Sequence, residues 1–214
     1  MTWAVSEQFG GSLSQLGPPG VRIGHRMVDL ENDALLLPAE EGGFAQALPD
    51  VRRRAAAARS LARELLSKAG HGPIAFPRSM GRPPGWPPGI VGSMSHAPAI
   101  AVAAIAGSGL LAGIGIDIEP ACDLPDDLAG VLRSPAELVR GNAVPAVTLF
   151  TVKEAVFKAI TLLTGMHPEF ADIDVDFECR TAAVAARIVV EFDYLSLDHV
   201  VALAWVRAGR LAMA

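Results

Sequence analysis

The stretch between Ala97 and Ile116 carries no charged side chain, and it constrains the fold more than any other part of the sequence. It is long enough to cross a membrane as a helix. However, Pro98 and the run Gly107-Ser108-Gly109 interrupt it, and residues of this kind mark turns between short strands. The pattern therefore predicts a buried β-hairpin, and we expect a protein without a membrane partner.

Composition excludes several classes of protein. With 51% apolar and 19% charged residues among 214, the chain can bury one sizeable core or two small packed ones. The formal net charge of −5 argues against a broad phosphate-neutralising surface, so we expect no nucleic-acid partner. The only cysteines are Cys122 and Cys179, and residues 1–10 lack the basic and apolar segments of a signal peptide, which predicts reduced thiols and a cytoplasmic location.

Periodicity and turn residues predict helix and strand in both halves of the chain. Good helix formers fill the segment from Pro49 to Ala69, and a second long helix is expected from Val147 to Thr164, ended by Gly165. The shorter expected elements are a proline-rich loop at 73–92, a helix at 135–140 and strands at 173–177, 186–192 and 199–206, with only short strands and loops before residue 41. We expect an α+β fold of two subdomains, residues 1–106 and 107–214.

Two carboxylates share one face of the strand expected at residues 113–120. The period of two in a strand puts the isoleucines at 114, 116 and 118 on one face, and Gly115, Asp117 and Glu119 on the other. Carboxylates placed in this way repel each other unless a cation lies between them, and oxygen ligands suit Mg²⁺. Gly115 would leave room for a phosphate group. Alternatively, the polar face of this strand is simply solvated.

The segment from Phe150 to Lys158 places a lysine within an apolar helix face. Lys153 has apolar neighbours three and four positions away on both sides, so its ammonium group leaves from the middle of that face. Such a lysine must reach water, pair with an acid or point into a cleft that binds an anion. A surface pair between Glu154 and Lys158 would explain those two residues but not Lys153.

Two serines and a histidine lie at the mouth of the uncharged stretch. Ser93, Ser95 and His96 can bond there to a phosphate or ribose group, although a purely structural histidine explains His96 equally well. A serine-hydrolase site is excluded by pattern, because no glycine follows two residues after either serine.

Arginines recur along the first long helix. Arg52, Arg59 and Arg63 form one stripe, which can clamp a phosphate group, although a solvated helix face is the more common meaning of such a stripe. We assign the other basic residues of the helix to the solvated face, namely Arg53, Arg54 and Lys68.

In this order, these pieces resemble the phosphopantetheinyl transferases of the Sfp type, most closely the branch typified by the enterobactin synthase component. The matching motifs are Trp86-Pro87 with Gly92-Ser93-Met94-Ser95-His96, the strand Gly115-Ile116-Asp117-Ile118-Glu119, and the helix Lys153-Glu154-Ala155 with Lys158. The arginine helix agrees best at Arg59 and Arg63 and more loosely at Arg52. The resemblance covers residues 52 to about 172.

The resemblance implies an enzyme that transfers the 4′-phosphopantetheine arm of coenzyme A to a serine of an apo carrier protein. The carrier would be an acyl or peptidyl carrier protein of a fatty acid, polyketide or nonribosomal peptide synthase. Asp117, Glu119 and Glu154 would hold Mg²⁺, for which Mn²⁺ can substitute, against the coenzyme A pyrophosphate. Asp117, Glu154 and Lys158 would be the catalytic residues, and either Glu154 or a water on the metal would take the proton of the carrier serine.

The resemblance also implies a set of coenzyme A-binding residues. Lys153 and Lys158 would bind the pyrophosphate or the 3′-phosphate, and His96 would contact the 3′-phosphate together with Arg52 and Arg59. The remaining implied contacts are Arg63 and Ser95, and Arg82, or Arg78 as the alternative, at the adenine side of the cleft. This branch often has a basic residue after the lysine helix, where the chain has Gly165-Met166-His167, so one phosphate contact is missing or comes from His167.

The family fold is two similar α/β halves related by a pseudo-twofold axis, with coenzyme A in the cleft between them, and its members usually act as monomers. Two alternatives stay open at this point. The chain is a catalytically inactive module that binds coenzyme A or a nucleotide, or it is an interaction domain that uses the basic helix face at residues 52–68.

Overall fold

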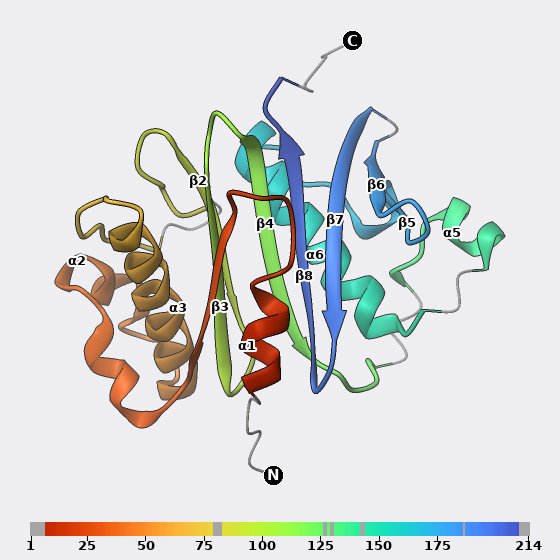
Figure 1. Ribbon diagram of the computed structural model, residues 1–214. Coiled ribbons are helices and arrows are strands. Elements are labelled where there is room, and N and C mark those ends of the chain that lie inside the picture. The colour runs from red at the N-terminus through yellow and green to blue at the C-terminus, as the bar shows by residue number, and fades with distance from the viewer. Residues whose placement is uncertain are drawn as a thin grey trace.

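Two antiparallel sheets stand side by side, and each packs against one long helix (Figure 1). The computed structural model describes residues 7–78, 83–125, 128, 131–141, 144–185 and 187–209. The chain passes from the first sheet to the second between Gly107 and Leu111. The structure and the α+β class expected from the sequence therefore agree.

The smaller sheet has the strand order β1-β3-β2, with β1 at Arg22–Met27, β2 at Ile90–His96 and β3 at Ile100–Gly107. Helix α3, Pro49–Lys68, packs on this sheet through Leu61 and Leu65, which approach the bare backbone of Gly24 on β1. Short helices precede α3 and lie on its outer side: η1 at Leu30–Leu35, α2 at Pro38–Glu41 and η2 at Gly42–Phe44.

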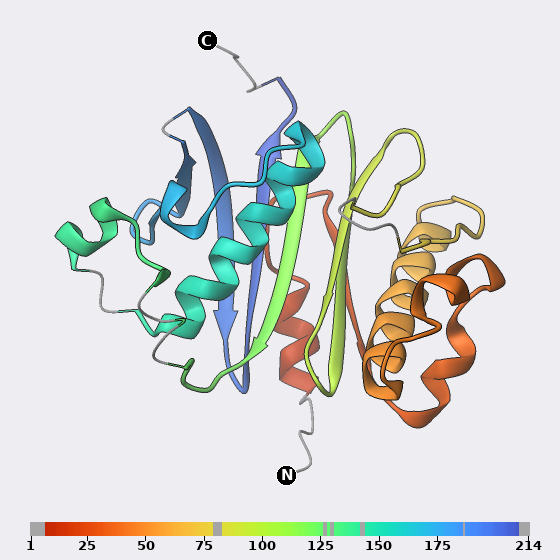
Figure 2. The same cartoon turned by 180° about the vertical axis from the view of Figure 1, so that it is seen from behind.

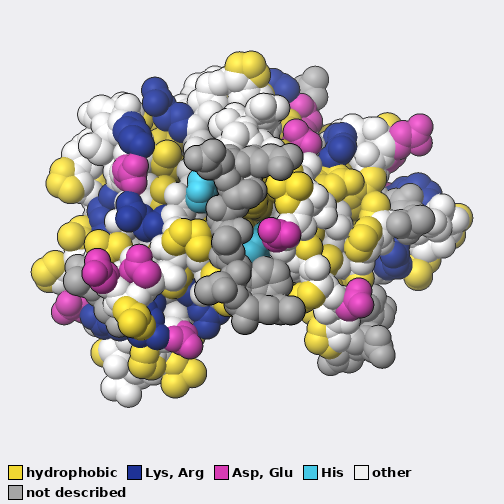
Figure 3. All heavy atoms as spheres, turned by 60° about the horizontal axis from the view of Figure 1, so that its bottom comes forward, with side chains coloured by type: hydrophobic (Ala, Val, Ile, Leu, Met, Phe, Trp, Pro, Cys, Tyr) yellow, Lys and Arg dark blue, Asp and Glu magenta, His cyan; other side chains and the backbone are white. Residues whose placement is uncertain are grey.

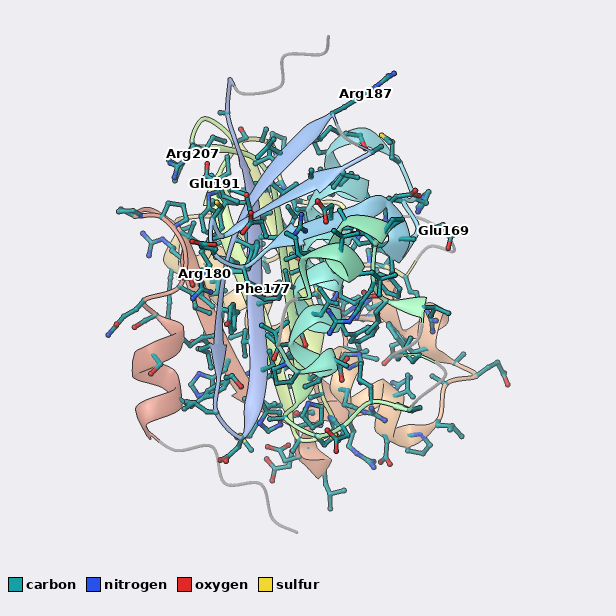
Figure 4. The ribbon with its side chains drawn as sticks, turned by 90° about the vertical axis from the view of Figure 1, so that its right-hand side faces the viewer. Glu169, Phe177, Arg180, Arg187, Glu191 and Arg207 are labelled. Carbon is teal, nitrogen blue, oxygen red and sulfur yellow. The ribbon has the colours of Figure 1, made fainter. Side chains whose placement is uncertain are left out.

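The larger sheet has the order β4-β8-β7-β6-β5, and helix α6, Ala146–Thr164, crosses one of its faces (Figure 2). Its strands are β4 at Leu111–Pro120, β5 at Ile173–Asp176, β6 at Thr181–Val184, β7 at Ile188–Ser196 and β8 at His199–Arg207. The short helix α5, Pro135–Arg140, and the turn η3, Phe170–Asp172, flank α6. Between the neighbouring strands β8 and β7, Arg207 donates two hydrogen bonds of 2.8 Å to Glu191 (Figure 4).

Helix α1, Glu7–Leu13, covers the face of the larger sheet opposite to α6, so it is seen in front of the strands in Figure 1. Its Phe9 and Leu13 share one apolar cluster with the three isoleucines of β4 at 114, 116 and 118. The same cluster includes Val102 and Ala104 of the smaller sheet, so the two sheets share a core. This continuous core fixes the junction between β2 and β4.

Most expected elements are confirmed, and one is wrong. The two long helices, the helix at 135–140 and the three C-terminal strands are present, and Gly165 ends α6 in the left-handed conformation. The expected hairpin at 97–116 does not form, because the chain turns after Gly107 into the other sheet, where β4 pairs with β8. The short elements α1, α2 and β6 were not expected. No helix in the described ranges is long and apolar enough to cross a membrane.

Candidate active site

Serine side chains join the two sheets where β2 runs beside β4. Because these strands belong to different sheets, no backbone ladder links them. Instead, Ser93 on β2 accepts a hydrogen bond of 3.1 Å from the backbone N–H of Ile116 on β4. Ser95, two residues further along the same face of β2, donates a hydrogen bond of 2.7 Å to Asp117. The junction therefore holds Asp117 in a fixed position.

Asp117 is almost fully buried, and only one of its two oxygens has a partner. Its Oδ1 accepts hydrogen bonds from Ser95 at 2.7 Å and from the Lys158 ammonium at 2.6 Å. Lys158 reaches across from α6 and also donates to Ser95 Oγ at 3.0 Å. Asp117 Oδ2 is buried and has no hydrogen-bond partner within the described residues. A buried carboxylate oxygen in this state is a place where a cation or a donor can bind.

The carboxylates of Glu119 and Glu154 interact electrostatically with Asp117. Burial, together with the charges of Asp117 and Glu154, raises the pKa of Glu119 to about 7. Burial and the charge of Asp117 likewise raise the pKa of Glu154, and Lys158 opposes this increase. One ammonium group thus faces three carboxylates in a partly desolvated place, which favours a second cation. In the described parts of the chain, however, no three His, Cys, Asp or Glu side chains are gathered into a ready-made metal cage.

Gly115 has a different role from the one expected. A Cβ atom at this position would lie 1.9 Å from the carbonyl oxygen of Ala155 and 2.7 Å from the backbone nitrogen of Ala159. The glycine therefore permits α6 to pack directly on β4, and the space expected for a phosphate group is filled by the helix. This close approach brings Lys158 and Glu154 of α6 to the carboxylates of β4.

A mostly apolar pocket of about 340 Å³ opens beside Lys158, between the two halves. Met94 of β2 and Trp86 of the loop before β2 line it on one side, and Phe157 and Leu162 of α6 line it on the other. Only glycine fits at position 92, because a Cβ atom there would lie 2.6 Å from the Trp86 ring. His167 also lines the pocket, so the residue that follows the lysine helix does reach the cleft.

The structure moves Lys153 from the phosphate-binding set to the core. Its side chain is 0% exposed, and its ammonium donates to Glu137 at 2.8 Å, to the Leu132 carbonyl at 2.6 Å and to the Phe170 carbonyl at 2.9 Å. Of the alternatives for a lysine on an apolar face, pairing with an acid is the one that occurs. All three N–H donors are used inside the protein, so none is left for a phosphate.

The arginines of α3 divide into two groups. Arg63 does not point to the cleft, because its guanidinium donates to Glu40 at 2.7 Å and to the Leu35 carbonyl. Arg52 lies 3.7 Å from Glu41, also on the outer side. Arg59, in contrast, acts electrostatically on His96, as do Arg54 and Lys158. The stripe of three arginines expected from the spacing is therefore wrong at Arg52 and Arg63, which face acids on α2.

His96, at the end of β2, lies within the electrostatic reach of cations from both α3 and α6. Burial lowers its pKa, and the charges of Arg54, Lys158 and Arg59 lower it further. Its Nδ1 is buried without a partner in the described structure. Arg54, which the sequence assigned to the solvated face, thus belongs to the surroundings of His96, and spacing along α3 gave no signal for it. Arg82 lies outside the described residues.

Arg78, in the loop after α3, lies close enough to Arg59 to act on it electrostatically. The Arg59 guanidinium lies 4.5 Å from the centre of the Phe44 ring, and the Arg78 guanidinium lies 5.5 Å from the same centre. We call Arg54, Arg59, Arg78 and His96 the basic end of the cleft. In Figure 3, Lys and Arg side chains gather on the side of the molecule that α3 forms.

Comparison with known proteins identifies the family. A family model described as the 4′-phosphopantetheinyl transferase N-terminal domain matches residues 39–106, and the 4′-phosphopantetheinyl transferase superfamily model matches residues 113–204. The 4′-phosphopantetheinyl transferase Svp of Streptomyces mobaraensis is 34% identical over 190 residues, which cover 83% of this chain and 76% of that protein.

Two other relatives carry the same name. The 4′-phosphopantetheinyl transferase Npt of Nocardia iowensis is 31% identical, over 75% of this chain and 74% of that protein. The 4′-phosphopantetheinyl transferase PptT of Mycobacterium tuberculosis is 30% identical, over 72% of this chain and 70% of that protein. The chain therefore belongs to the 4′-phosphopantetheinyl transferase superfamily, and it is a transferase enzyme.

Proposed function

We propose that this enzyme transfers the 4′-phosphopantetheine arm of coenzyme A to a serine of an apo carrier protein and releases 3′,5′-adenosine bisphosphate. The observation that carries the proposal is the junction of β2, β4 and α6, where Lys158 and Ser95 meet the buried Asp117 beside an apolar pocket. Charged groups next to an apolar pocket suit a substrate with phosphates at one end and an uncharged arm at the other.

The two ends of the cleft suit the two ends of coenzyme A. The pocket of about 340 Å³ between Trp86 and Phe157 suits the pantetheine arm, which is flexible and uncharged and carries aliphatic segments between its amide groups. The basic end, with Arg59, Arg78 and His96, suits the phosphate groups of the nucleotide. Lys158 lies between the two regions, because it contacts Asp117 and also lines the pocket.

Asp117, Glu119 and Glu154 would hold Mg²⁺, or Mn²⁺ in its place. Their chemistry fits a hard divalent cation, because they supply carboxylate oxygens, Asp117 Oδ2 has no partner among the described residues, and burial together with the charges of neighbouring acids raises the pKa values of Glu119 and Glu154. When bound, the ion supplies positive charge that neutralises the pyrophosphate of coenzyme A.

The protein's own groups account for the remaining chemistry. Transfer forms a bond between the carrier serine oxygen and the β-phosphorus of coenzyme A and breaks the bond from that phosphorus to the bridging oxygen, which leaves with the adenosine bisphosphate. Lys158 holds an ammonium where charge develops on the phosphates. Glu154 would accept the serine proton, because it is the carboxylate of α6 that lies beside Lys158 and Asp117 at this junction.

Intact-protein mass spectrometry tests this proposal. Purified enzyme is incubated with coenzyme A, Mg²⁺ and a panel of apo acyl and peptidyl carrier proteins, and we expect one phosphopantetheine group per carrier. Asp117→Ala should abolish the mass shift, whereas the matched control Asp193→Asn, an acid 40% exposed on β7, should retain it. Tight binding of coenzyme A without any modified carrier would instead support the inactive binding module. The carrier partners and a monomeric state are part of the same proposal.

A further inference from the structure

A buried glutamate lies behind the basic end of the cleft. Glu40, on helix α2, is 0% exposed, and three donors bind its carboxylate. Oε1 accepts from the Arg63 guanidinium and from the backbone N–H of Phe76, both at 2.7 Å, and Oε2 accepts from the backbone N–H of Leu37 at 2.9 Å. A buried charge is costly unless it is paired and hydrogen-bonded, so this carboxylate holds its three partners firmly.

One of those partners begins the segment that carries Arg78. Glu40 accepts from the Phe76 N–H, and Arg59 Nε donates to the Phe76 carbonyl at 2.8 Å. Both backbone groups of Phe76 are thus held, one from α2 and one from α3. The Phe76 ring is 0% exposed and packs against Trp86 with ring centres 4.9 Å apart. The chain direction at residue 76 is therefore fixed, and Arg78 follows two residues later.

The same group of elements shapes the place where Arg78 lies. Arg78 and Arg59 share the ring of Phe44. The backbone passes so close that a Cβ on Gly43 would lie 2.7 Å from the Arg78 Cβ. Of the charged groups that act on Arg59, two are cations, Arg63 and Arg78, and one is an anion, Glu40. Three guanidinium groups around a single buried carboxylate leave positive charge for an outside anion.

We propose that Glu40 is a positioning residue, which holds the segment from Phe76 to Arg78 against α3 so that Arg59 and Arg78 together receive one phosphate group of the substrate. This inference rests on the proposed function: the phosphate is the 3′-phosphomonoester that the resemblance gives to Arg59, and the structure adds Arg78 as a second contact and Glu40 as the residue that positions it. Glu40 acts only through the two arginines, since it is fully buried and its own oxygens are occupied. Phe44 and Gly43 serve the same purpose, the first as a platform and the second by leaving space.

The test compares two ligands that differ by that phosphate alone, coenzyme A and 3′-dephospho-coenzyme A, by isothermal titration calorimetry. Glu40→Gln keeps the size of the side chain but turns one oxygen into a donor, so it cannot accept all three hydrogen bonds. Arg78→Ala removes the exposed guanidinium directly. We expect each variant to weaken coenzyme A binding about tenfold and to change 3′-dephospho-coenzyme A binding by less than about twofold.

A double variant separates positioning from general destabilisation. If Glu40 acts through Arg78, then Glu40→Gln combined with Arg78→Ala should bind coenzyme A no more weakly than the weaker single variant. Gly43→Ala, which displaces Arg78 without touching a charge, should reproduce the ligand-selective loss and replaces Glu40→Gln if that variant does not fold. The matched control is Glu191→Gln, which also removes an arginine pair but between strands β7 and β8 of the larger sheet (Figure 4), and it should bind both ligands as the wild type does.

Equal losses for both ligands, or additive losses in the double variant, would overturn the positioning role. A wild-type enzyme that binds both ligands equally would overturn the assignment of the phosphate, even if carrier proteins are still modified. A wild-type enzyme that neither binds coenzyme A nor modifies a carrier would refute the proposed function together with this inference.

Discussion

Replacement of Lys153 by methionine distinguishes between two roles for this residue, a structural ion pair in the core and a contact with the substrate phosphates. The family motif makes Lys153 a natural candidate for the coenzyme A phosphates. In the structure, its ammonium is enclosed by Glu137 and by the carbonyls of Leu132 and Phe170, which lie before α5 and after α6. Lys153→Met keeps the length and most of the volume of the side chain but removes all three hydrogen bonds. We therefore expect the substitution to lower the free energy of unfolding and not the affinity for coenzyme A.

The size of this loss follows from the burial of both partners. Lys153 and Glu137 are 0% and 1% exposed, and the substitution leaves the Glu137 carboxylate buried without its cation. Breaking a buried ion pair from one side costs about 3 to 5 kcal/mol. In a chain of this size, that corresponds to a fall in Tm of roughly 6 to 20 °C. Lys153→Met combined with Glu137→Gln should recover part of it, because the buried charge is then removed.

Thermal unfolding followed by circular dichroism measures the Tm, and steady-state kinetics on the folded enzyme measures KM for coenzyme A. We expect KM to stay near the wild-type value. Lys68→Met is the matched control, since its side chain is 63% exposed and its ammonium pairs with Glu64 on the same helix, so it should lose less than about 1 kcal/mol. An unchanged Tm with a KM raised tenfold or more in Lys153→Met would show that the ammonium meets the substrate and that our assignment is wrong.

Three further results are expected. Gly115→Ala should cost about 3 kcal/mol or more in urea unfolding, because its Cβ would meet the Ala155 carbonyl at 1.9 Å, whereas Gly11→Ala, with nothing within 4 Å, should not destabilise the protein. Glu119 has a pKa raised from 4.5 to about 7. Without metal, its contribution to stability should therefore be fully present below pH 4.5 and be lost as the pH rises through 7. A wild-type Tm that changes with pH just as in Glu119→Gln would contradict this. Asp117→Asn should lower kcat/KM for carrier modification at least about 100-fold while the Tm shows a folded protein, and near-normal turnover would remove Asp117 from the site.

Features that depend on the local sequence were predicted well, namely the two long helices and the two faces of β4. The long helix α3 is rich in alanine, leucine and arginine, and α6 is followed by Gly165, so local propensity and a left-handed stop define them. The alternation on β4 correctly separated its isoleucines from Asp117 and Glu119. These assignments succeeded because each depends on neighbours within a few positions along the chain.

Assignments that needed a distant partner failed. Arg63 and Lys153 both seemed available to a phosphate, yet each is bound to a glutamate, Glu40 and Glu137, that lies on a short helix. Spacing within α3 or α6 cannot show which acid packs against it. Gly115 was misinterpreted for the same reason, because the group that fills its empty side is the backbone of another element. Helix α1 was missed because two glycines weaken its propensity, and it forms by burying Phe9 and Leu13.

The two buried glutamates, Glu40 and Glu137, have the same surroundings in the two halves of the molecule, although the sequence they share is only three residues long. Each follows a proline and an alanine at the start of a short helix, in Pro38-Ala39-Glu40 and in Pro135-Ala136-Glu137. Each accepts from a backbone N–H three residues earlier, at 2.9 Å and 2.8 Å, from a cation of the long helix beside it, and from one N–H of a later segment, Phe76 or Val175. The same three-residue motif thus ties a short helix to a long one in both halves. This shared bonding pattern is what two halves related by a pseudo-twofold axis would retain, and it explains why the glutamates sit behind the site instead of in it.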